Sequence, residues 1–374
     1  MESNTRNNKH LNKLVFRRRI QEMQGNIKVR ELSIENWRGI KKTRKPIKLK
    51  KINILVGRNN TGKTAILEAL ALLPYPHKML GYLGNSSILN YIIKYHWSTK
   101  SLVYRYHGRA SITYVIEEED IGNILYRIEY DSGSNNIMAL YNILGFDNVF
   151  FPGVVVDNTT RKIKRKGMIK TDRDLMKLFG TKFEVLLLYA SSNLYESLAS
   201  FFDNPDNWSV IESRGAHTRV VEEIINPTVD DEYTEVHLGK RGIEIRRRDA
   251  RWIHVRDLGS GVQRVLLTAL IIEYVDPDIV LIDDFEVALH PALMKNFLKY
   301  LVRRGCQVVL TTHSRDTIEL FDEIDVPADE GQVIVLYKDS NDIVRARYID
   351  TSELHEILES GIDIRKALNL LEPE

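Results

Sequence analysis

Cysteine is almost absent from this sequence of 374 residues, with Cys306 as the single example. One cysteine excludes an internal disulfide and any metal site built from several cysteines. No run of about 18 uncharged apolar residues occurs, which excludes a typical membrane-spanning helix. The N-terminus is polar and basic and lacks the apolar segment of a secretory signal. These absences lead us to expect a cytoplasmic protein without a membrane partner.

An excess of charge of one sign is also lacking, because the formal net charge is only +2. The cations are unevenly distributed, however: residues 1–51 contain 16 Lys or Arg and four acids, and residues 161–166 contain five cations in six positions. Such runs attract phosphate backbones. They are equally typical of a solvated tail and a solvated hairpin tip.

Short apolar runs alternate with segments of helical periodicity, which predicts an α/β protein. We expect residues 1–26 to form a basic N-terminal arm, because they show no apolar pattern of their own. Residues 101–156 resemble an antiparallel meander, residues 172–225 are rich in helix signals, and residues 233–256 return to strand patterns. Two buried parallel strands are expected at 279–282 and 308–310, with a helix between them and a hairpin near 333–349.

A glycine-bounded loop lies between a short strand ending at Val56 and a helix beginning near Thr64. Its sequence fits the phosphate-binding pattern G-x-x-x-x-G-K-[ST], in which backbone N–H groups surround phosphate oxygens. Lys63 would reach the β- and γ-phosphates of ATP, and Thr64 would ligate Mg²⁺. The full loop consists of Gly57, Arg58, Asn59, Asn60, Thr61, Gly62, Lys63 and Thr64.

Acidic residues follow the apolar strand at 279–282, at the sheet edge where the loop is also expected. Asp283 is our candidate for holding Mg²⁺, while Asp284 or Glu286 could polarise the attacking water. His313 follows the next apolar strand and could contact the γ-phosphate. An acid-rich helix start and a structural histidine are the alternatives.

A helix is predicted to begin at the string Leu258-Gly259-Ser260-Gly261-Val262-Gln263. Ser260 can serve as its N-cap, and the glycines allow a close approach. The helix is either simply a capped helix or an anion site aimed at a phosphate across a dimer interface.

Together these motifs resemble the ABC-type ATPases, and most closely their RecF, SMC and OLD branch. The opening Asn36-Trp37-Arg38-Gly39 and the phrase Glu286-Val287-Ala288-Leu289-His290-Pro291 resemble motifs of that branch. The resemblance covers residues 29–349. It implies a P-loop NTPase fold with a two-lobed head, in which a mixed sheet is joined by an antiparallel sheet and a short helical lid.

The implied head spans residues 27–349, divided into lobe I at 27–170, a helical insertion at 172–225 and lobe II at 233–349. Residues 350–374 would form a helical tail. The resemblance further implies a head-to-head homodimer closed around ATP and Mg²⁺. Ser260, Gly261 and Gln263 of one subunit would meet the γ-phosphate bound by the other, and Asn36 and Arg38 would lie near the nucleotide.

Two departures from the family pattern stand out. The second acid after the strand is usually Glu, whereas here it is the shorter Asp284. The usual Q-loop glutamine is missing, because no Gln occurs between Gln24 and Gln263. A long coiled-coil insertion and a nuclease domain of the Toprim type are also not expected.

The predicted function is therefore an ATP-hydrolysing dimeric switch acting on DNA through residues 1–51 and 161–166, in repair or defence by family analogy. The alternative is a weakly hydrolysing ATP sensor that regulates an effector protein, which the short Asp284 favours. A GTPase is less favoured because no N-K-x-D string occurs, and a transporter subunit is disfavoured by the Asn36-Trp37-Arg38-Gly39 opening.

Overall fold

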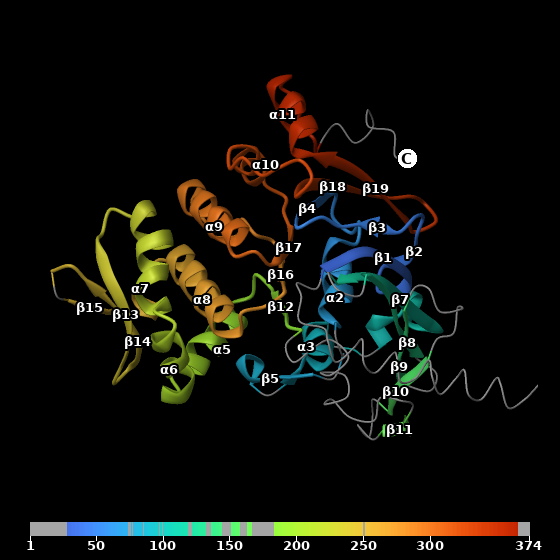
Figure 1. Cartoon of the computed structure of the whole chain (residues 1–374), viewed down its shortest axis with the longest axis horizontal. Coiled ribbons are helices and arrows are strands. Elements are labelled where there is room, and N and C mark those ends of the chain that lie inside the picture. Colours follow the sequence, from blue (N-terminus) through green and yellow to red (C-terminus); the bar gives the residue numbers. More distant parts are fainter. Residues whose placement is uncertain are drawn as a thin grey trace, which may run out of the picture.

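The computed structural model describes residues 28–73, 76, 78–84, 86–96, 98, 100–118, 122–131, 136–143, 151–157, 163–166, 183–249 and 251–365 (Figure 1). The expected basic arm at 1–26 lies outside these residues, as do Arg161 and Lys162 of the second basic run. Among the described helices, none combines the length and the apolar character needed to cross a membrane.

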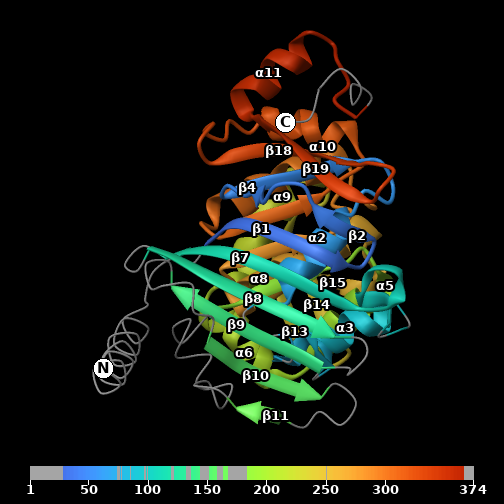
Figure 2. The same cartoon turned by 90° about the vertical axis from the view of Figure 1, so that its right-hand side faces the viewer.

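One mixed sheet of 14 strands runs through the molecule. Its strands follow the order β11-β10-β9-β8-β7-β1-β2-β19-β18-β4-β17-β16-β12, with β3 paired to β1. Figure 2 shows the antiparallel strands β7 to β11 at one end and β18, β19 and α11 toward the other. The strands are β1 (Lys28–Trp37), β2 (Ile40–Thr43), β3 (Ile47–Lys48), β4 (Ile52–Gly57), β7 (Arg109–Glu118), β8 (Gly122–Asp131), β9 (Asn136–Ile143), β10 (Phe151–Asp157), β11 (Ile163–Lys166), β12 (Val185–Leu188), β16 (Ile279–Ile282), β17 (Gln307–Thr311), β18 (Gly331–Lys338) and β19 (Ile343–Asp350).

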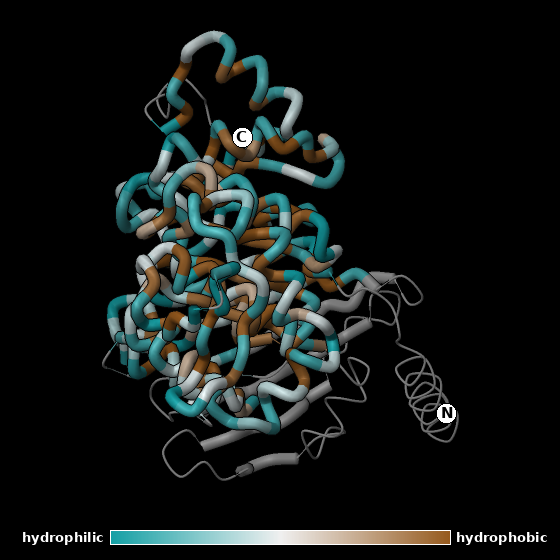
Figure 3. The backbone as a smooth tube through the Cα atoms, turned by 90° about the vertical axis from the view of Figure 1, so that its left-hand side faces the viewer, coloured by the Kyte–Doolittle hydropathy of each residue, from teal (hydrophilic) through white to brown (hydrophobic). Residues whose placement is uncertain are grey.

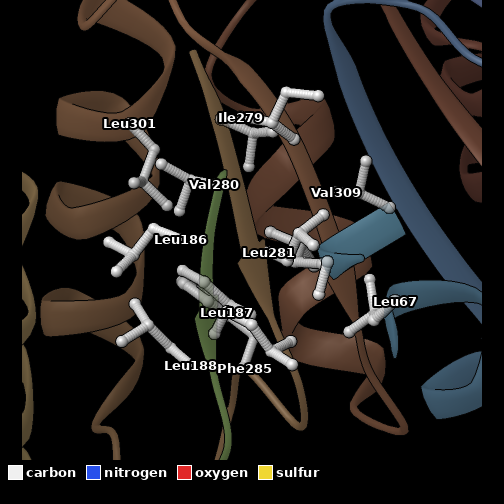
Figure 4. Close-up of a cluster of buried hydrophobic side chains, with 14 of the residues drawn as sticks. Leu67, Leu186, Leu187, Leu188, Ile279, Val280, Leu281, Phe285, Leu301 and Val309 are labelled. Atoms are coloured by element: carbon white, nitrogen blue, oxygen red, sulfur yellow. The ribbon is translucent and has the colours of Figure 1, made fainter. Parts of the chain in front are cut away.

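The strands β4, β17, β16 and β12 are parallel and almost entirely apolar, as expected for strands buried on both faces. Helices cover them: α2 (Lys63–Ala71), α8 (Ser260–Val275), α9 (Pro291–Arg303) and α10 (Arg315–Asp322). Figure 4 shows Leu67 of α2 and Leu301 of α9 packed around Leu187 of β12, Leu281 of β16 and Val309 of β17. This core fixes the carboxyl ends of the four strands at one edge.

The segment from 183 to 225 contains a strand that the sequence did not predict. Residues 185–188 form β12, which pairs in parallel with β16 at the edge of the large sheet. Three helices follow it and pack against α8, namely α5 (Ser192–Phe202), α6 (Pro205–Ser213) and α7 (Ala216–Val220). The run at 185–188 is mostly leucine and lies among helix signals, whereas the predicted strand at 279–282 is rich in β-branched residues, which explains the omission.

A smaller antiparallel sheet follows these helices, formed by β13 (Tyr233–Gly239), β14 (Gly242–Arg247) and β15 (Trp252–His254). Between α2 and β7 the chain adds β5 (Met79–Leu80), β6 (Ser86–Ser87) and α3 (Ile88–Tyr95), and after β19 it adds α11 (Thr351–Glu359). In Figure 3 the hydrophobic segments lie mainly inside the molecule, with hydrophilic loops around them.

Candidate functional site

The loop from Gly57 to Thr64 connects β4 to α2 at the carboxyl edge of the parallel strands. Gly62 has a φ of 101°, and a Cβ atom there would lie 2.8 Å from Cδ1 of Ile40, so a larger residue does not fit. Lys63 Nζ donates to the carbonyl oxygens of Gly57 at 3.0 Å and Arg58 at 3.2 Å. The ammonium group is therefore held inside the curve of the loop, where phosphates bind in such loops.

Lys63 is buried at the start of α2, and this burial lowers the pKa of its ammonium group. The negative charges of Asp284, Asp283 and Glu286 raise this pKa and so partly offset the effect of burial. The loop residues Arg58, Asn59 and Asn60 are exposed, while Thr61 is buried and donates to the Arg58 carbonyl at 2.9 Å.

Thr64 and Asp283 meet at the sheet edge, although they are far apart in the sequence. Thr64 Oγ1 lies 3.0 and 3.2 Å from the two carboxylate oxygens of Asp283, and Thr311 Oγ1 donates to Oδ1 at 2.7 Å. Asp283 is only 4% exposed, and burial raises the pKa of its carboxyl to about 6, with hydrogen bonds from Thr311 and Thr64 acting against the rise.

These oxygen donors fit Mg²⁺, which is usually bound by one or two protein oxygens together with substrate phosphates and waters. Among the described residues, no group of three or more His, Cys, Asp or Glu could hold a metal without such help. Thr64 and Asp283 are therefore suited to a metal that arrives with a nucleotide.

Asp284 and Glu286 lie in different environments. Within the described part of the chain, no hydrogen bond involves the Asp284 carboxylate, and its backbone has a φ of 46°. Both oxygens of Glu286 are occupied: Oε2 accepts from Thr312 Oγ1 and Oε1 accepts from the backbone N–H of His313, each at 2.8 Å. Asp284 is thus the more available base, and Glu286 fixes the loop that carries His313.

His313 is exposed at the end of β17, next to this group of acids. Its backbone carbonyl accepts a hydrogen bond from Arg365 at 2.8 Å, which attaches the segment after α11 to the same loop. The imidazole itself makes no hydrogen bond with the described residues and is available for a ligand.

The start of α8 packs tightly on the turn after β16. The N-cap is Gly259, not the predicted Ser260, and no side chain caps the helix. A Cβ atom on Gly261 would lie 2.4 Å from the carbonyl oxygen of Ala288, so only glycine allows this approach. Ser260 is exposed and Gln263 half-buried, and no hydrogen bond joins Ser260, Gly261 or Gln263 to the phosphate loop.

Arg264, the residue after Gln263, is a contact that the sequence did not predict. Its guanidinium donates to the carbonyls of Val287 at 2.6 Å, Asp284 at 3.0 Å and Asp283 at 3.4 Å, and the residue is 7% exposed. The glycine-rich helix start and the acidic turn are therefore joined within one subunit.

Arg38 contacts Glu68 of α2, and neither it nor Asn36 forms a hydrogen bond with the phosphate loop. Arg38 Nε lies 2.9 Å from Oε2 of Glu68, whose side chain is fully buried, and NH1 donates to the Ser101 carbonyl at 3.2 Å. Asn36 is exposed. A Cβ atom on Gly39 would lie 3.7 Å from Oδ1 of Asn60, so the turn that contains these residues does adjoin the loop.

Comparison with known families adds to this geometry. Residues 27–214, half of the chain, match the family described as AAA ATPase domain. The chain belongs to this family. A second match, to an AAA domain named for a suspected AbiEii toxin of a type IV toxin–antitoxin system, covers residues 180–319 of this ATPase-family chain. No curated protein matches the chain.

Solved structures similar to this AAA ATPase-family chain include two SMC heads. One is bound to the C-winged helix domain of ScpA, with a TM-score of 0.57. The other has an extended coiled coil and is bound to the C-terminal domain of ScpA derived from Pyrococcus furiosus, with a TM-score of 0.54. Each comparison covers 89% of this chain and 99% of the other at 11% identity.

The recombination mediator RecF is also similar, at a TM-score of 0.46 and 14% identity over 87% of this chain and 99% of that chain. The predicted α/β P-loop ATPase fold, similar to that of SMC heads, is confirmed. Members of this ATPase class in general bind and hydrolyse ATP.

Two aromatic residues of this AAA ATPase-family chain also lie at the site and were not predicted. Tyr189 directly follows β12, and Tyr95 ends α3 and stacks on it. The apolar run at 185–188 was the available signal for Tyr189, since side chains that follow a parallel strand gather at the ligand-binding edge. No sequence pattern indicates Tyr95, because a tyrosine at the end of an amphipathic helix is commonplace.

Proposed function

We propose that this chain binds ATP with Mg²⁺ and hydrolyses it as a nucleotide-gated, head-to-head homodimer. The observation that carries the proposal is the pairing of Thr64 with the buried Asp283, beside an ammonium group held within the phosphate loop. A hydroxyl and a carboxylate in this arrangement suit a metal shared with the β- and γ-phosphates.

Each residue has a role in this proposal. Lys63 would exchange its two carbonyl contacts for phosphate oxygens, and Thr64 and Asp283 would hold Mg²⁺, which would neutralise charge on the phosphates. Asp284 accepts the proton of the attacking water, and His313 contacts the γ-phosphate. Glu286 keeps the His313 loop in place through its two hydrogen bonds. Asn36 and Arg38 line the nucleotide side of the β1–β2 turn.

The dimer is supported by the start of α8. Ser260 is exposed, no side chain caps the helix, and no hydrogen bond links this helix start to the subunit's own phosphate loop. Uncapped N–H groups at a helix start attract anions. We therefore propose that Ser260, Gly261 and Gln263 complete the nucleotide site of a second copy.

The test is phosphate release from ATP with Mg²⁺, measured for the wild type and for Lys63→Ala. We expect turnover that requires Mg²⁺, disappears in the variant and rises per subunit with protein concentration as dimers form. A wild type with no turnover and no ATP affinity would refute the proposal. Thermal unfolding of both proteins shows whether the variant remains folded.

The second candidate is a weakly hydrolysing ATP sensor that controls an effector protein. The short side chain of Asp284 favours it, because a carboxylate one methylene shorter than Glu reaches less far toward the water. Turnover of Asp284→Glu separates the two functions. A large gain over the wild type supports the sensor, whereas equal or lower turnover supports the ATPase. The SMC heads to which the fold is similar bind ScpA, so a protein partner is also in keeping with this fold.

DNA is the partner that we propose for the active ATPase. Lys41, Lys42, Arg44 and Lys45 are exposed around the end of β2, and none forms an ion pair with a described residue. The backbone N–H groups of Lys41 and Arg44 donate to Asp342 and Val344 at 3.0 and 2.8 Å, which holds this basic turn against the β18–β19 hairpin. A fixed cluster of unpaired cations suits a phosphate backbone.

A further inference from the structure

The carboxyl ends of four parallel strands meet at the candidate site, and three of them carry the predicted residues. β4 leads to the phosphate loop, β16 to Asp283 and β17 to His313. The fourth strand, β12, ends beside β16, where the backbone N–H of Asp283 donates to the Leu188 carbonyl at 2.9 Å. The next residue, Tyr189, is therefore the direct neighbour of the metal-side carboxylate.

Tyr189 is held in place by a buried hydrogen bond to α2. Its hydroxyl donates to Oε1 of Glu68 at 2.7 Å, and both residues are completely buried. Glu68 lies one helical turn after Thr64, and it also contacts His96 Nε2 at 2.5 Å and Arg38 Nε at 2.9 Å. Burial raises the pKa of the Tyr189 phenol well above its ordinary value, so this proton stays in place.

Tyr95, the last residue of α3, packs against the Tyr189 ring. Its ring stacks on Tyr189 with 4.1 Å between centroids and 1° between planes, and it meets His96 edge-on at 4.9 Å. Tyr95 is nevertheless 43% exposed. The buried side of α3 is formed instead by Ile88, Leu89 and Ile92, so packing alone does not require a tyrosine here.

Tyr95 stacks on the residue that directly follows Leu188, whose carbonyl accepts from the Asp283 N–H, so its ring lies at the same strand edge as the acidic turn. Burial raises the pKa of the Tyr95 phenol, and the carboxylates of Asp283 and Asp284 raise it further. At neutral pH the hydroxyl therefore keeps its proton and can both donate and accept a hydrogen bond.

We propose that Tyr95 is a catalytic residue that orients the attacking water, with Tyr189 and Glu68 as positioning residues beneath it; this inference rests on the proposed ATPase function. The water donates one hydrogen bond to Asp284 and the other to the Tyr95 oxygen, which leaves a lone pair directed at the γ-phosphorus. The new O–P bond forms as the bond between the γ-phosphorus and the β–γ bridging oxygen breaks, and Asp284 takes the proton.

This arrangement compensates for both departures from the family pattern. The chain has no glutamine between Gln24 and Gln263, and Asp284 has a short reach. A second hydrogen-bond acceptor for the water restricts its orientation, which is how side-chain amides act on the water in other nucleotide hydrolases.

The test compares Tyr95→Phe with Tyr91→Phe. The first variant removes the hydroxyl and keeps the stacked ring, and the second is a matched control on the same helix. We expect kcat of Tyr95→Phe to fall by on the order of 100-fold, the effect of losing the orientation of a reacting group. KM for ATP should change less than twofold, and Tyr91→Phe should match the wild type in both. Tyr189→Phe should lower kcat by a smaller factor.

A second measurement keeps the inference testable if turnover is slow. Calorimetric titration with ADP, Mg²⁺ and aluminium fluoride, which imitates the transferring phosphate, should give weaker binding to Tyr95→Phe than to wild type, with equal binding of ADP alone. If the wild type hydrolyses ATP and Tyr95→Phe retains kcat within twofold and binds the fluoride complex equally, the Tyr95 role is wrong and the ATPase proposal stands. If the wild type binds neither ATP nor ADP, both the Tyr95 role and the ATPase proposal fail.

Discussion

Residues with left-handed backbone conformations gather around the candidate site. Asn36, Arg38, Asn60, Asp284 and Ala288 all have φ values between 46° and 64°. Such conformations cost of order 1–3 kcal/mol each in non-glycine residues and persist only where the surrounding structure enforces them. Asp adopts this conformation more readily than Glu does, which gives a local reason for the short acid at position 284.

Asp278 gives a prediction for the pH dependence of stability. It lies before β16, where its Oδ2 accepts from the Glu184 backbone N–H at 2.8 Å, and burial raises the pKa of its carboxyl to about 6. The folded state therefore binds this proton more tightly than the unfolded state. The resulting stabilisation is complete below about pH 4 and is lost as the pH rises through about 6.

Asp278→Asn removes the charge and keeps an oxygen for the Glu184 N–H. We expect the free energy of unfolding in urea to rise by about 1–3 kcal/mol at pH 7.5, the equivalent of up to two pKa units, with little change at pH 4. Equal effects at the two pH values would show that the charge is not the cause.

Among individual residues, the sequence predicted those that belong to known sequence motifs. The phosphate loop, Asp283 and His313 do lie at one edge, because each follows an apolar strand. Tyr95, Tyr189 and Arg264 could not be predicted, since their positions depend on which strands and helices are neighbours. Arg38 was expected near the nucleotide but contacts buried Glu68, and the sequence does not indicate that Glu68 lies beside it.

Among the elements, α8 and the acidic turn after β16 behave as one unit. Gly261 permits close contact with Ala288, and Arg264 binds three carbonyls of the turn. A displacement of the helix start in a dimer would therefore be transmitted directly to Asp283 and Asp284. Coupling between sites is carried by contiguous packed and hydrogen-bonded contacts of this kind.

Gly261→Ala tests this coupling. The added methyl group would lie 2.4 Å from the Ala288 carbonyl, so the helix or the turn must shift. We expect a loss of about 1–3 kcal/mol in unfolding free energy, the usual cost of forcing extra atoms into a packed contact. ATP turnover should fall at least tenfold.

The matched control is Gly259→Ala, because a Cβ atom at Gly259 would meet nothing within 4 Å. Because Gly259 is the N-cap of α8, where glycine is preferred to alanine, the variant should lose no more than about 1 kcal/mol of unfolding free energy. If both variants behave alike, the contact between α8 and the turn is not important.

The elements differed in how well their sequences indicated them. The helices after the phosphate loop and after Leu258 and the strands β18 and β19 were all expected. β18, for example, contains the apolar run Val333–Tyr337, which is typical of a buried strand. β12 was missed because its run is mostly leucine and lies among helix signals, unlike the β-branched run of β16. For residues 101–156 the sequence predicted an antiparallel meander but not its place in the large sheet. Strand order within the 14-stranded sheet depends on long-range pairing.

Across the whole molecule, the large sheet connects the nucleotide edge to the basic turn. β2 pairs with β19, β19 with β18, and β18 with β4, which leads into the phosphate loop. Only two strands, β19 and β18, thus lie between the strand of the basic turn and the strand that leads to the phosphate loop. The fold class could be predicted because its motifs occur in a fixed order along the chain, whereas the partner could not.

Neutralising the basic turn tests DNA binding. With Lys41, Lys42, Arg44 and Lys45 all changed to Ala, we expect weaker binding to double-stranded DNA. The slope of log affinity against log salt should become shallower by about one to four, roughly 0.9 for each phosphate that the protein no longer neutralises. The measurement is a salt titration of fluorescence anisotropy.

The control carries the same charge change on the small sheet, where each arginine already has a carboxylate partner. Its substitutions are Arg241→Ala, Arg246→Ala, Arg248→Ala and Arg251→Ala. We expect its salt slope to match that of the wild type. An equal reduction in the two proteins would mean that only net charge matters, and the basic turn would lose its assigned role.

The lone cysteine has a practical consequence for following the proposed dimer. Burial raises the pKa of the Cys306 thiol to about 11, so at pH 7 almost none of it is the reactive thiolate. A thiol introduced at an exposed position with no role in the proposed site, such as Ser352, would therefore accept a maleimide dye selectively, with the native cysteine left in place. Energy transfer between such dyes on two copies could report head engagement in real time, as ATP is added and consumed.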